Sequence, residues 1–274
     1  MKGKLISEYD TVDEVISKVI DSPQYRYISQ ALIKRIALSE LEKRRNLRET
    51  VKAVKNKLHQ VGGAYLDRAI DYESYMDILQ TAYHQGAEKF RQACKHVMCY
   101  HSSTRERLPD LDRFYREILA DIPAVKRIID LACGFHPLAI PWMGLPADVE
   151  YIAVDIYRDM IDFINWYLSL ICIRGSAHVR DVIGTFPTDE ADVAFVLKTL
   201  PCLEQVDKSI GIKLLDGLPV KYIIVSFPKQ SLTGRRDKGM HANYANRFLE
   251  IFGNKAWTVK SYGFTNELVY VVKK

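Results

Sequence analysis

The segment Val125-Lys-Arg-Ile-Ile-Asp-Leu-Ala-Cys-Gly-Phe-His-Pro137 decides the fold class of this chain. Its first half is a short apolar run with β-branched residues, and the run stops at Cys133-Gly134, as a buried parallel strand does when it enters a glycine turn. Asp130 lies near the carboxyl end of this strand, where open α/β sheets bind their ligands. The segment therefore predicts a central parallel strand with a ligand site at its tip.

A second predicted strand, Tyr151-Ile-Ala-Val-Asp155, again ends in a carboxylate, 21 residues after Gly134. The glycine allows the backbone to approach a ligand, and Asp155 can accept hydrogen bonds from both hydroxyls of a ribose. A dinucleotide site would carry Gly-x-Gly-x-x-Gly to hold a pyrophosphate, but only Gly134 precedes Pro137. The pattern favours S-adenosylmethionine, which has a ribose and an adenine but no phosphate. An ordinary sheet turn is the alternative.

After these two strands the chain continues to alternate between strands and helices. The further strands are predicted near residues 177–182, 191–197, 222–226, 257–262 and 267–272, and the helices near 160–168, 204–215 and 244–252. Alternation of this kind, closed by an antiparallel hairpin, predicts an α/β fold: the Rossmann-like sheet of a class I S-adenosylmethionine-dependent methyltransferase.

The first hundred residues have helical periodicity instead. One helix is predicted to begin at the capping box Thr11-Val-Asp-Glu14. Further helices are predicted near residues 29–41, 72–83 and 86–100. A third helix, between the first two of these ranges, follows residue 41 and ends near residue 59. We therefore expect an all-helical N-terminal domain over residues 1–107, followed by the methyltransferase domain over residues 108–274.

The positive charge is concentrated in the helical part. Residues 1–107 contain 19 Lys and Arg against 14 Asp and Glu, whereas residues 108–274 contain 20 of each kind. In the third helix, Arg44, Arg48, Lys52 and Lys55 form a basic stripe beside an apolar stripe. This asymmetry predicts contact with a polyanion such as RNA, and a solvated charged face is the alternative.

Composition also limits the class of protein. No apolar run approaches the roughly 18 residues that a membrane span needs, and the five cysteines show no Cys-x-x-Cys spacing. We expect reduced thiols, no metal site, no membrane partner and a cytoplasmic location. The oligomeric state is not written in the sequence, and a monomer is our expectation.

Several motifs occur in order along the chain. They are Leu58-His59 with Gly63-Ala-Tyr65, His101-x-Ser-Thr-Arg-Glu-Arg-Leu108, Asp130-Leu-Ala-Cys-Gly134, Leu197-Lys-Thr-Leu-Pro-Cys-Leu-Glu204, Ser226-Phe-Pro with Ser231-Leu232, Gly234-Arg235, Lys238-Gly-Met240, Asn243-Tyr244 and Asn266-Glu-Leu-x-Tyr270. Through them the chain resembles the aminoglycoside-resistance 16S rRNA (guanine(1405)-N(7))-methyltransferase family, and it is most similar to the enzymes of aminoglycoside-producing actinomycetes. The family usually has Leu-Asn where this chain has Phe135-His136, so the role of the asparagine is not transferred to His136.

The resemblance implies a set of residues that bind S-adenosylmethionine. Arg107 would pair with the methionine carboxylate, Asp155 would hold the ribose, and Asp181 would accept a hydrogen bond from the adenine amine. The full set is Tyr65, Ser103, Arg107, Ala132, Gly134, Asp155, Asp181, Val182 and Leu197. Without the resemblance, a surface ion pair would be the plainer interpretation of Arg107, and a helix cap that of Asp181.

Guanine N7 carries a lone pair and no proton, so its methylation needs no general base and depends on positioning. We expect Lys198 and Glu204 to orient the target nucleotide; a Lys198–Glu204 ion pair is the alternative. The resemblance implies helix 44 of 16S rRNA in the assembled 30S subunit as the substrate, with the base flipped from its stack. Arg235, Arg236 and Lys238, after the fifth strand, are predicted to grip RNA near the target.

Three other functions remain open at this level. One is N1 methylation of the adenine at position 1408, and another is a 30S-binding or assembly protein that keeps the fold without turnover. A small-molecule methyltransferase is the third, although it would have little use for the basic helix.

Overall fold

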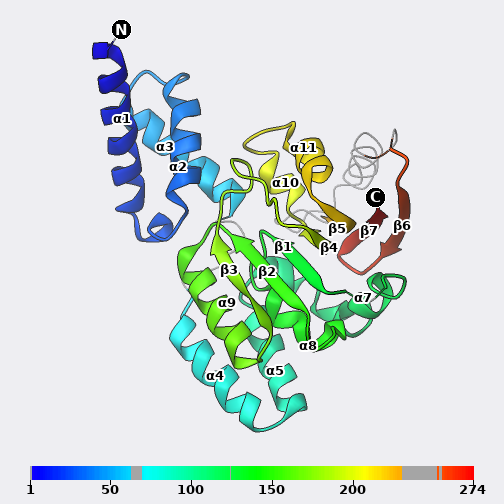
Figure 1. Ribbon diagram of the computed structural model, residues 1–274. Coiled ribbons are helices and arrows are strands. Elements are labelled where there is room, and N and C mark those ends of the chain that lie inside the picture. The colour runs from blue at the N-terminus through cyan, green and yellow to red at the C-terminus, as the bar shows by residue number, and fades with distance from the viewer. Residues whose placement is uncertain (1, 63–69, 124, 230–251, 253–254) are drawn as a thin grey trace.

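A computed structural model of the protein describes residues 2–62, 70–123, 125–229, 252 and 255–274. Its centre is a seven-stranded sheet with strand order β3-β2-β1-β4-β5-β7-β6 (Figure 1). The strands are β1 (Arg127–Leu131), β2 (Glu150–Asp155), β3 (Arg174–Val179), β4 (Ala191–Leu197), β5 (Val220–Pro228), β6 (Thr258–Gly263) and β7 (Glu267–Lys273). The first five run parallel, and β7 runs antiparallel to both β5 and β6. This is the class I methyltransferase sheet that the sequence predicted.

The strand register brings the functional tips together. Leu131 of β1 pairs with Val154 of β2, and Leu197 of β4 pairs with Ser226 of β5. Because parallel strands end at a common edge, the residues that follow β1, β2 and β4 meet there.

The third strand lies earlier than predicted, at Arg174–Val179 instead of near 177–182. Asp181 explains the difference, because its side chain accepts a hydrogen bond from Ile183 N and its carbonyl accepts from Gly184 N and Thr185 N. These bonds form a turn that begins at Asp181, so the strand ends at Val179 and does not continue to residue 182.

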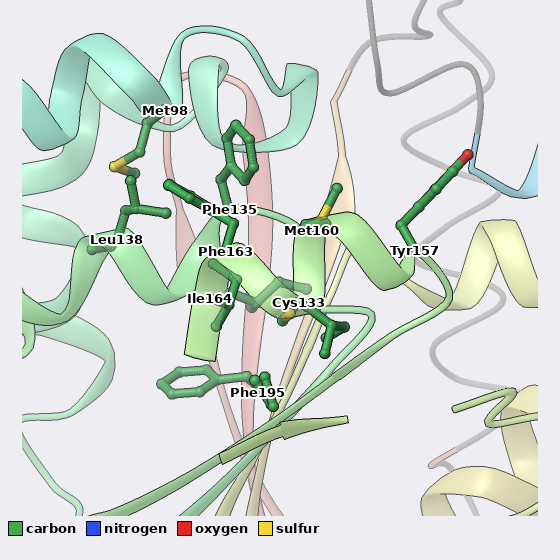
Figure 2. Close-up of a cluster of buried hydrophobic side chains, with 14 of the residues drawn as sticks. Met98, Cys133, Phe135, Leu138, Tyr157, Met160, Phe163, Ile164 and Phe195 are labelled. Carbon is green, nitrogen blue, oxygen red and sulfur yellow. The ribbon is translucent and has the colours of Figure 1, made fainter. Parts of the chain in front are cut away.

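Both faces of the sheet are covered, as the alternation of buried side chains requires. Ile128 and Phe195 join a hydrophobic cluster on one face, and their neighbours Ile129 and Val196 join a second cluster on the other. The first face packs against α9 (Arg158–Leu170), whose Phe163 and Ile164 lie in the cluster drawn in Figure 2. The second face packs against α11 (Ile210–Gly217).

The N-terminal helices fall into two groups (Figure 1). Helices α1 (Lys2–Ile20), α2 (Gln30–Leu41) and α3 (Leu47–Val61) pack on one another, and we call them the helical lobe. Helices α4 (Tyr72–His84) and α5 (Ala87–Met98) belong instead to the layer beside α9, where the ring of Phe90 stacks on that of Tyr167. Among the described residues no helix is both long and apolar enough to cross a bilayer.

Two helix predictions need correction. Helix α1 begins at Lys2, so the capping box at Thr11 lies inside it; no proline or glycine stops the helix between residues 4 and 10. The helix predicted over 204–215 is observed as α11, which begins only at Ile210, because Asp207 accepts hydrogen bonds from Ser209 and forms a turn before it. A short helix, α10 (Leu200–Leu203), lies before the predicted range. The helix predicted near 244–252 lies almost wholly outside the described residues.

Candidate cofactor site

A cavity opens at the carboxyl edge of the sheet, beside the tips of β1, β2 and β4. The predicted residues that line it are Ser103, Ala132, Asp155, Asp181, Val182, Leu197 and Lys198. Residues far apart in the sequence are thus brought to one site, as the sequence analysis expected. Tyr65 lies outside the described residues.

Asp155, at the end of β2, has the environment that a ribose ligand requires. Its Oδ2 accepts a hydrogen bond from Gly134 N at 2.9 Å, and its Oδ1 accepts one from Ile156 N at 2.6 Å. Burial raises the pKa of Asp155, and these backbone hydrogen bonds offset part of the rise. A carboxylate offers about four lone-pair sites, so Asp155 can still accept hydrogen bonds from ligand hydroxyls.

Gly134 is required by its surroundings. Its φ is +50°, and a Cβ at this position would lie 2.6 Å from the ring of His101, which itself lines the cavity. The glycine therefore supports the site indirectly, by donating to Asp155 and by making room for His101.

Two residues other than glycine also adopt a left-handed backbone conformation at the strand tips. Ala132, directly after β1, has φ +50°, and Lys198, directly after β4, has φ +56°. Such conformations cost on the order of 1 kcal/mol each and are typical of ligand sites. Both residues line the cavity, so the backbone strain is located at the candidate site.

Asp181 is held at the opposite side of the cavity by an unexpected partner. Its Oδ2 accepts a hydrogen bond from Arg35 Nε at 2.7 Å, and Arg35 belongs to α2 of the helical lobe. The second oxygen accepts from Ile183 N at 3.0 Å. Asp181 caps a turn, not the helix that the plainer interpretation expected, and it also lines the cavity.

Arg107 does not reach the cavity in this structure. It is 2% exposed, and its guanidinium binds both carboxylate oxygens of Glu267, at 2.7 and 3.0 Å. Its cation also lies over the ring of Phe114. To bind the methionine carboxylate as the resemblance implies, Arg107 would have to exchange this partner. Glu267 lies 160 residues away in the sequence, so the pair could not be anticipated.

Lys198 connects this buried pair to the cavity. Its Nζ lies 2.6 Å from Glu106 Oε2 and 3.9 Å from Glu267 Oε2. The alternative interpretation paired Lys198 with Glu204, whereas these contacts are with Glu106 and Glu267. Burial opposes ionisation of Glu267, but the charges of Arg107 and Lys198, with hydrogen bonds from Arg107 and Ser226, hold its pKa below the usual value.

The structure assigns His136 a place in the core. It is 3% exposed, and its Nδ1 lies 2.9 Å from Asp130 Oδ2, which also accepts a hydrogen bond from Tyr151 at 2.8 Å. Its ring stacks on Tyr115 and meets Phe195 edge to face. Asp130 therefore serves the packing behind the strand tip, and neither it nor His136 lines the cavity.

The predicted basic stripe is only partly on one helix. Arg44 precedes α3, whose N-cap is Asn46, and it binds Glu40 of α2 at 2.9 Å. Arg48 and Lys52 are exposed on α3, whereas Lys55 is half-buried and donates to Ser22.

Helix α3 passes close to the cavity. It packs against α10, and Lys57 Nζ donates to Gln205 O at 2.7 Å, which brings α3 next to the segment that contains Glu204. Arg235, Arg236 and Lys238 lie outside the described residues.

Several cavity residues were missed from the sequence. Leu32, Val61 and Gly62 come from the helical lobe, and Thr199 and Leu203 follow β4. Thr199 lies within a motif quoted for the resemblance, so position alone could have suggested it. The helical lobe residues carry no local signal, because an apolar side chain on an amphipathic helix normally indicates core packing.

Comparison with known proteins identifies the family of this chain. Residues 21–271 match the family described as ribosomal RNA methyltransferase (FmrO). The chain is 35% identical over 268 residues to a 16S rRNA (guanine(1405)-N(7))-methyltransferase of Micromonospora rosea, covering 97% of both chains. It is 36% identical over 272 residues to the enzyme of that name from Frankia casuarinae, covering 98% of this chain and 95% of the relative.

Solved structures show the same architecture along nearly all of the chain. The 16S rRNA methyltransferase RmtF, in complex with S-adenosyl-L-homocysteine, superposes with a TM-score of 0.82 at 26% identity and covers 96% of this chain and 98% of its own. An rRNA methylase from Escherichia coli gives 0.76, also at 26% identity, with 96% and 99% covered. The chain therefore belongs to the FmrO family of ribosomal RNA methyltransferases, as its motifs predicted.

Proposed function

We propose that this protein transfers the methyl group of S-adenosylmethionine to N7 of the guanine at position 1405 of 16S rRNA. The observation that carries the proposal is one cavity that gathers Asp155, Asp181 and Lys198, in a chain 35% identical over 97% of its length to enzymes with this activity. We expect the product to exclude 4,6-disubstituted deoxystreptamines such as gentamicin and kanamycin, because N7 methylation fixes a positive charge on the base.

The residues at the strand tips fit S-adenosylmethionine. Asp155 retains capacity to accept hydrogen bonds from a ribose, and Asp181 can accept one from an adenine amine. Val182 and Leu203 supply an apolar wall of the cavity. When bound, S-adenosylmethionine supplies an electrophilic methyl group on a sulfonium. Leu197 and the strained backbone of Ala132 line the cavity and would contact its methionyl part, and we propose that Gly134 contributes through the backbone turn that it forms.

The protein residues act by holding the target base. Since guanine N7 has no proton to lose, no side chain has to act as a general base. We propose that Lys198, anchored by Glu106, and Glu204, beside α3, orient the nucleotide or its phosphate. Arg107 would then support Lys198 indirectly through Glu267.

We propose the helical region, residues 1–107, as the part that binds the 30S subunit, with the methyltransferase domain over 108–274. Arg48 and Lys52 present exposed cations on α3. Arg44 adds a third cation, which forms an ion pair with Glu40. Arg235, Arg236 and Lys238 remain the proposed second contact. The target in helix 44 is paired, so the base would be flipped out toward Lys198. We expect a monomer that acts in the cytoplasm, where its substrate lies.

Mapping the modified nucleotide in cells tests this function. 16S rRNA from bacteria that express the protein is treated with borohydride and aniline, which cleave the chain at N7-methylguanine. Cleavage at position 1405, together with gentamicin resistance, is the expected result, and both should be lost in Asp155→Ala. Uncleaved rRNA would contradict the proposal, and modification at adenine 1408 would support the alternative activity.

A further inference from the structure

We propose that Arg35 is a positioning residue for the adenine end of the cofactor, so that the helical lobe is an integral part of the cofactor site. This inference deepens the proposed function, because it rests on Asp181 as the partner of the adenine amine. Four observations carry it: a backbone seam, a buried carboxylate, a glycine and the shape of the cavity wall.

The seam joins the helical lobe to the loop that follows Asp155. Ser29 N donates to Ile156 O at 2.7 Å, and Arg158 N donates to Tyr27 O at 2.8 Å, with Ile28 and Tyr157 forming an antiparallel bridge between them. Two backbone hydrogen bonds and a bridge fix the start of α2 against the strand tip that carries the proposed ribose ligand.

From this fixed start, α2 carries Arg35 to Asp181. The carboxylate of Asp181 is only 4% exposed, whereas the Arg35 side chain is 41% exposed. A buried carboxylate needs a counter-charge or hydrogen-bond donors, and Arg35 Nε supplies a charge-assisted hydrogen bond at 2.7 Å. A half-exposed pair contributes little to overall stability. Its principal effect is therefore to fix the orientation of the carboxylate.

Gly184 provides the space in which the guanidinium lies. A Cβ built on Gly184 would be 1.8 Å from Arg35 Nη2 and 3.1 Å from Asp181 Oδ2. The backbone of Gly184 has no positive φ, so conformation does not demand glycine there. The absence of a side chain instead allows the arginine to lie over the turn that presents Asp181.

The cavity wall supports the same assignment. Leu32, one helical turn before Arg35, lines the cavity together with Val182 and Ile183 from the Asp181 turn. One side of the proposed adenine subsite is thus made by α2, and the other by the segment after β3. Arg35 binds the two together, with Oδ1 of Asp181 held by Ile183 N.

Two ligands that differ only at the exocyclic amine test the proposal. Calorimetry would measure the affinity of the full-length protein for S-adenosylhomocysteine and for its purine-riboside analogue, in which a hydrogen atom replaces the amine. We expect Arg35→Ala to weaken S-adenosylhomocysteine by about fivefold, the effect of one misplaced hydrogen bond, and to leave the purine-riboside analogue nearly unchanged. The ratio of the two affinities, which measures the preference for the amine, should therefore fall.

A second variant reaches the same outcome without removing a charge. Gly184→Ala should displace the flexible end of Arg35 and lower the preference for the amine. Arg35→Lys, which keeps the positive charge, should retain part of the preference that Arg35→Ala loses. Lys34→Ala, an exposed neighbour on α2, is the matched control and should bind both ligands as the parent does. Equal weakening of both ligands by Arg35→Ala and Gly184→Ala would show a merely structural role and overturn the proposal, as would parental binding in both.

Asp181→Ala separates this inference from the proposed function. If Asp181→Ala abolished the preference for the amine and Arg35→Ala did not, the inference would be wrong and the adenine role of Asp181 would stand. If Asp181→Ala kept the full preference, the adenine role itself would be wrong, and the inference would fall with it.

Discussion

Glu267 is a buried carboxylate that contacts several polar side chains behind the strand tips. It accepts hydrogen bonds from Arg107 and Ser226 and lies 3.9 Å from the amine of Lys198. Two cations behind the strand tips thereby share one carboxylate from β7, and Glu106 supplies a second negative charge beside Lys198. Since buried ion pairs add little net stability but are costly to break, this cluster fixes the position of Lys198 and makes the site sensitive to any loss of Glu267.

We predict that Glu267→Gln lowers the free energy of unfolding by about 3 kcal/mol near neutral pH, because Arg107 remains buried without a counter-charge. The pKa of Glu267 is lowered in the folded state, so its contribution is present above the usual carboxyl pKa and is lost as the pH falls through the folded pKa. Urea unfolding of both proteins at neutral and acid pH checks this. The difference in the free energy of unfolding between the parent and Glu267→Gln should become smaller at acid pH.

Glu14→Gln is a suitable control, since Glu14 belongs to an exposed pair with Lys18 on α1. Its effect should stay within about 0.5 kcal/mol. A Glu267→Gln protein as stable as the parent, or a gap that widens in acid, would contradict this account of the cluster.

At the scale of elements, the strands were largely predictable and the contacts between elements were not. Each strand is an apolar run that ends in a turn, so β1, β2 and β4 and their tips followed from local pattern. The side-chain turn at Asp181 ends the third strand earlier than the sequence predicted. Pairs such as Arg107–Glu267 and Arg35–Asp181 join residues 160 and 146 positions apart, and no local spacing specifies such contacts.

Helix α3 is the element that we propose contacts the phosphates of RNA. Of the four predicted cations, Arg48 and Lys52 are exposed on this helix. We predict that Arg48→Glu with Lys52→Glu weakens 30S binding at least about tenfold and lowers its salt dependence, because two phosphate contacts are lost. Binding of S-adenosylhomocysteine should not change. Filter binding across a salt series, with calorimetry for the small ligand, measures both.

Lys221→Glu provides the comparison, since Lys221 is an exposed cation at the amino end of β5, away from the cavity edge. Its 30S affinity should match that of the parent. Equal losses in the two proteins would indicate a general charge effect, and joint loss of 30S and small-ligand binding would indicate misfolding.

In the whole molecule, the helical region is not a simple appendage. The hydrophobic cluster on one face of the sheet extends without interruption into α2, α3, α4 and α5. Helices α4 and α5 cover α9, and the helical lobe supplies a wall of the cavity. A boundary at residue 107, drawn from composition and charge, therefore separates segments that share one core.

We predict that a fragment of residues 108–274 does not fold cooperatively, because it exposes the face that α4 and α5 cover, including the stacked ring of Tyr167. A fragment of residues 70–274 keeps this cover and should give a cooperative thermal transition by circular dichroism. Cooperative melting of the shorter fragment would show instead that residues 108–274 are an independent domain.

The proposed methylation can be measured with the purified protein and its substrate. 30S subunits from a susceptible bacterium are incubated with the protein and radiolabelled S-adenosylmethionine, and the labelled nucleotide is located in the extracted rRNA. We predict one methyl group per subunit, on N7 of guanine 1405, and none with Asp155→Ala. Label on another nucleotide, or intact 30S subunits left unlabelled by the parent protein, would contradict the account.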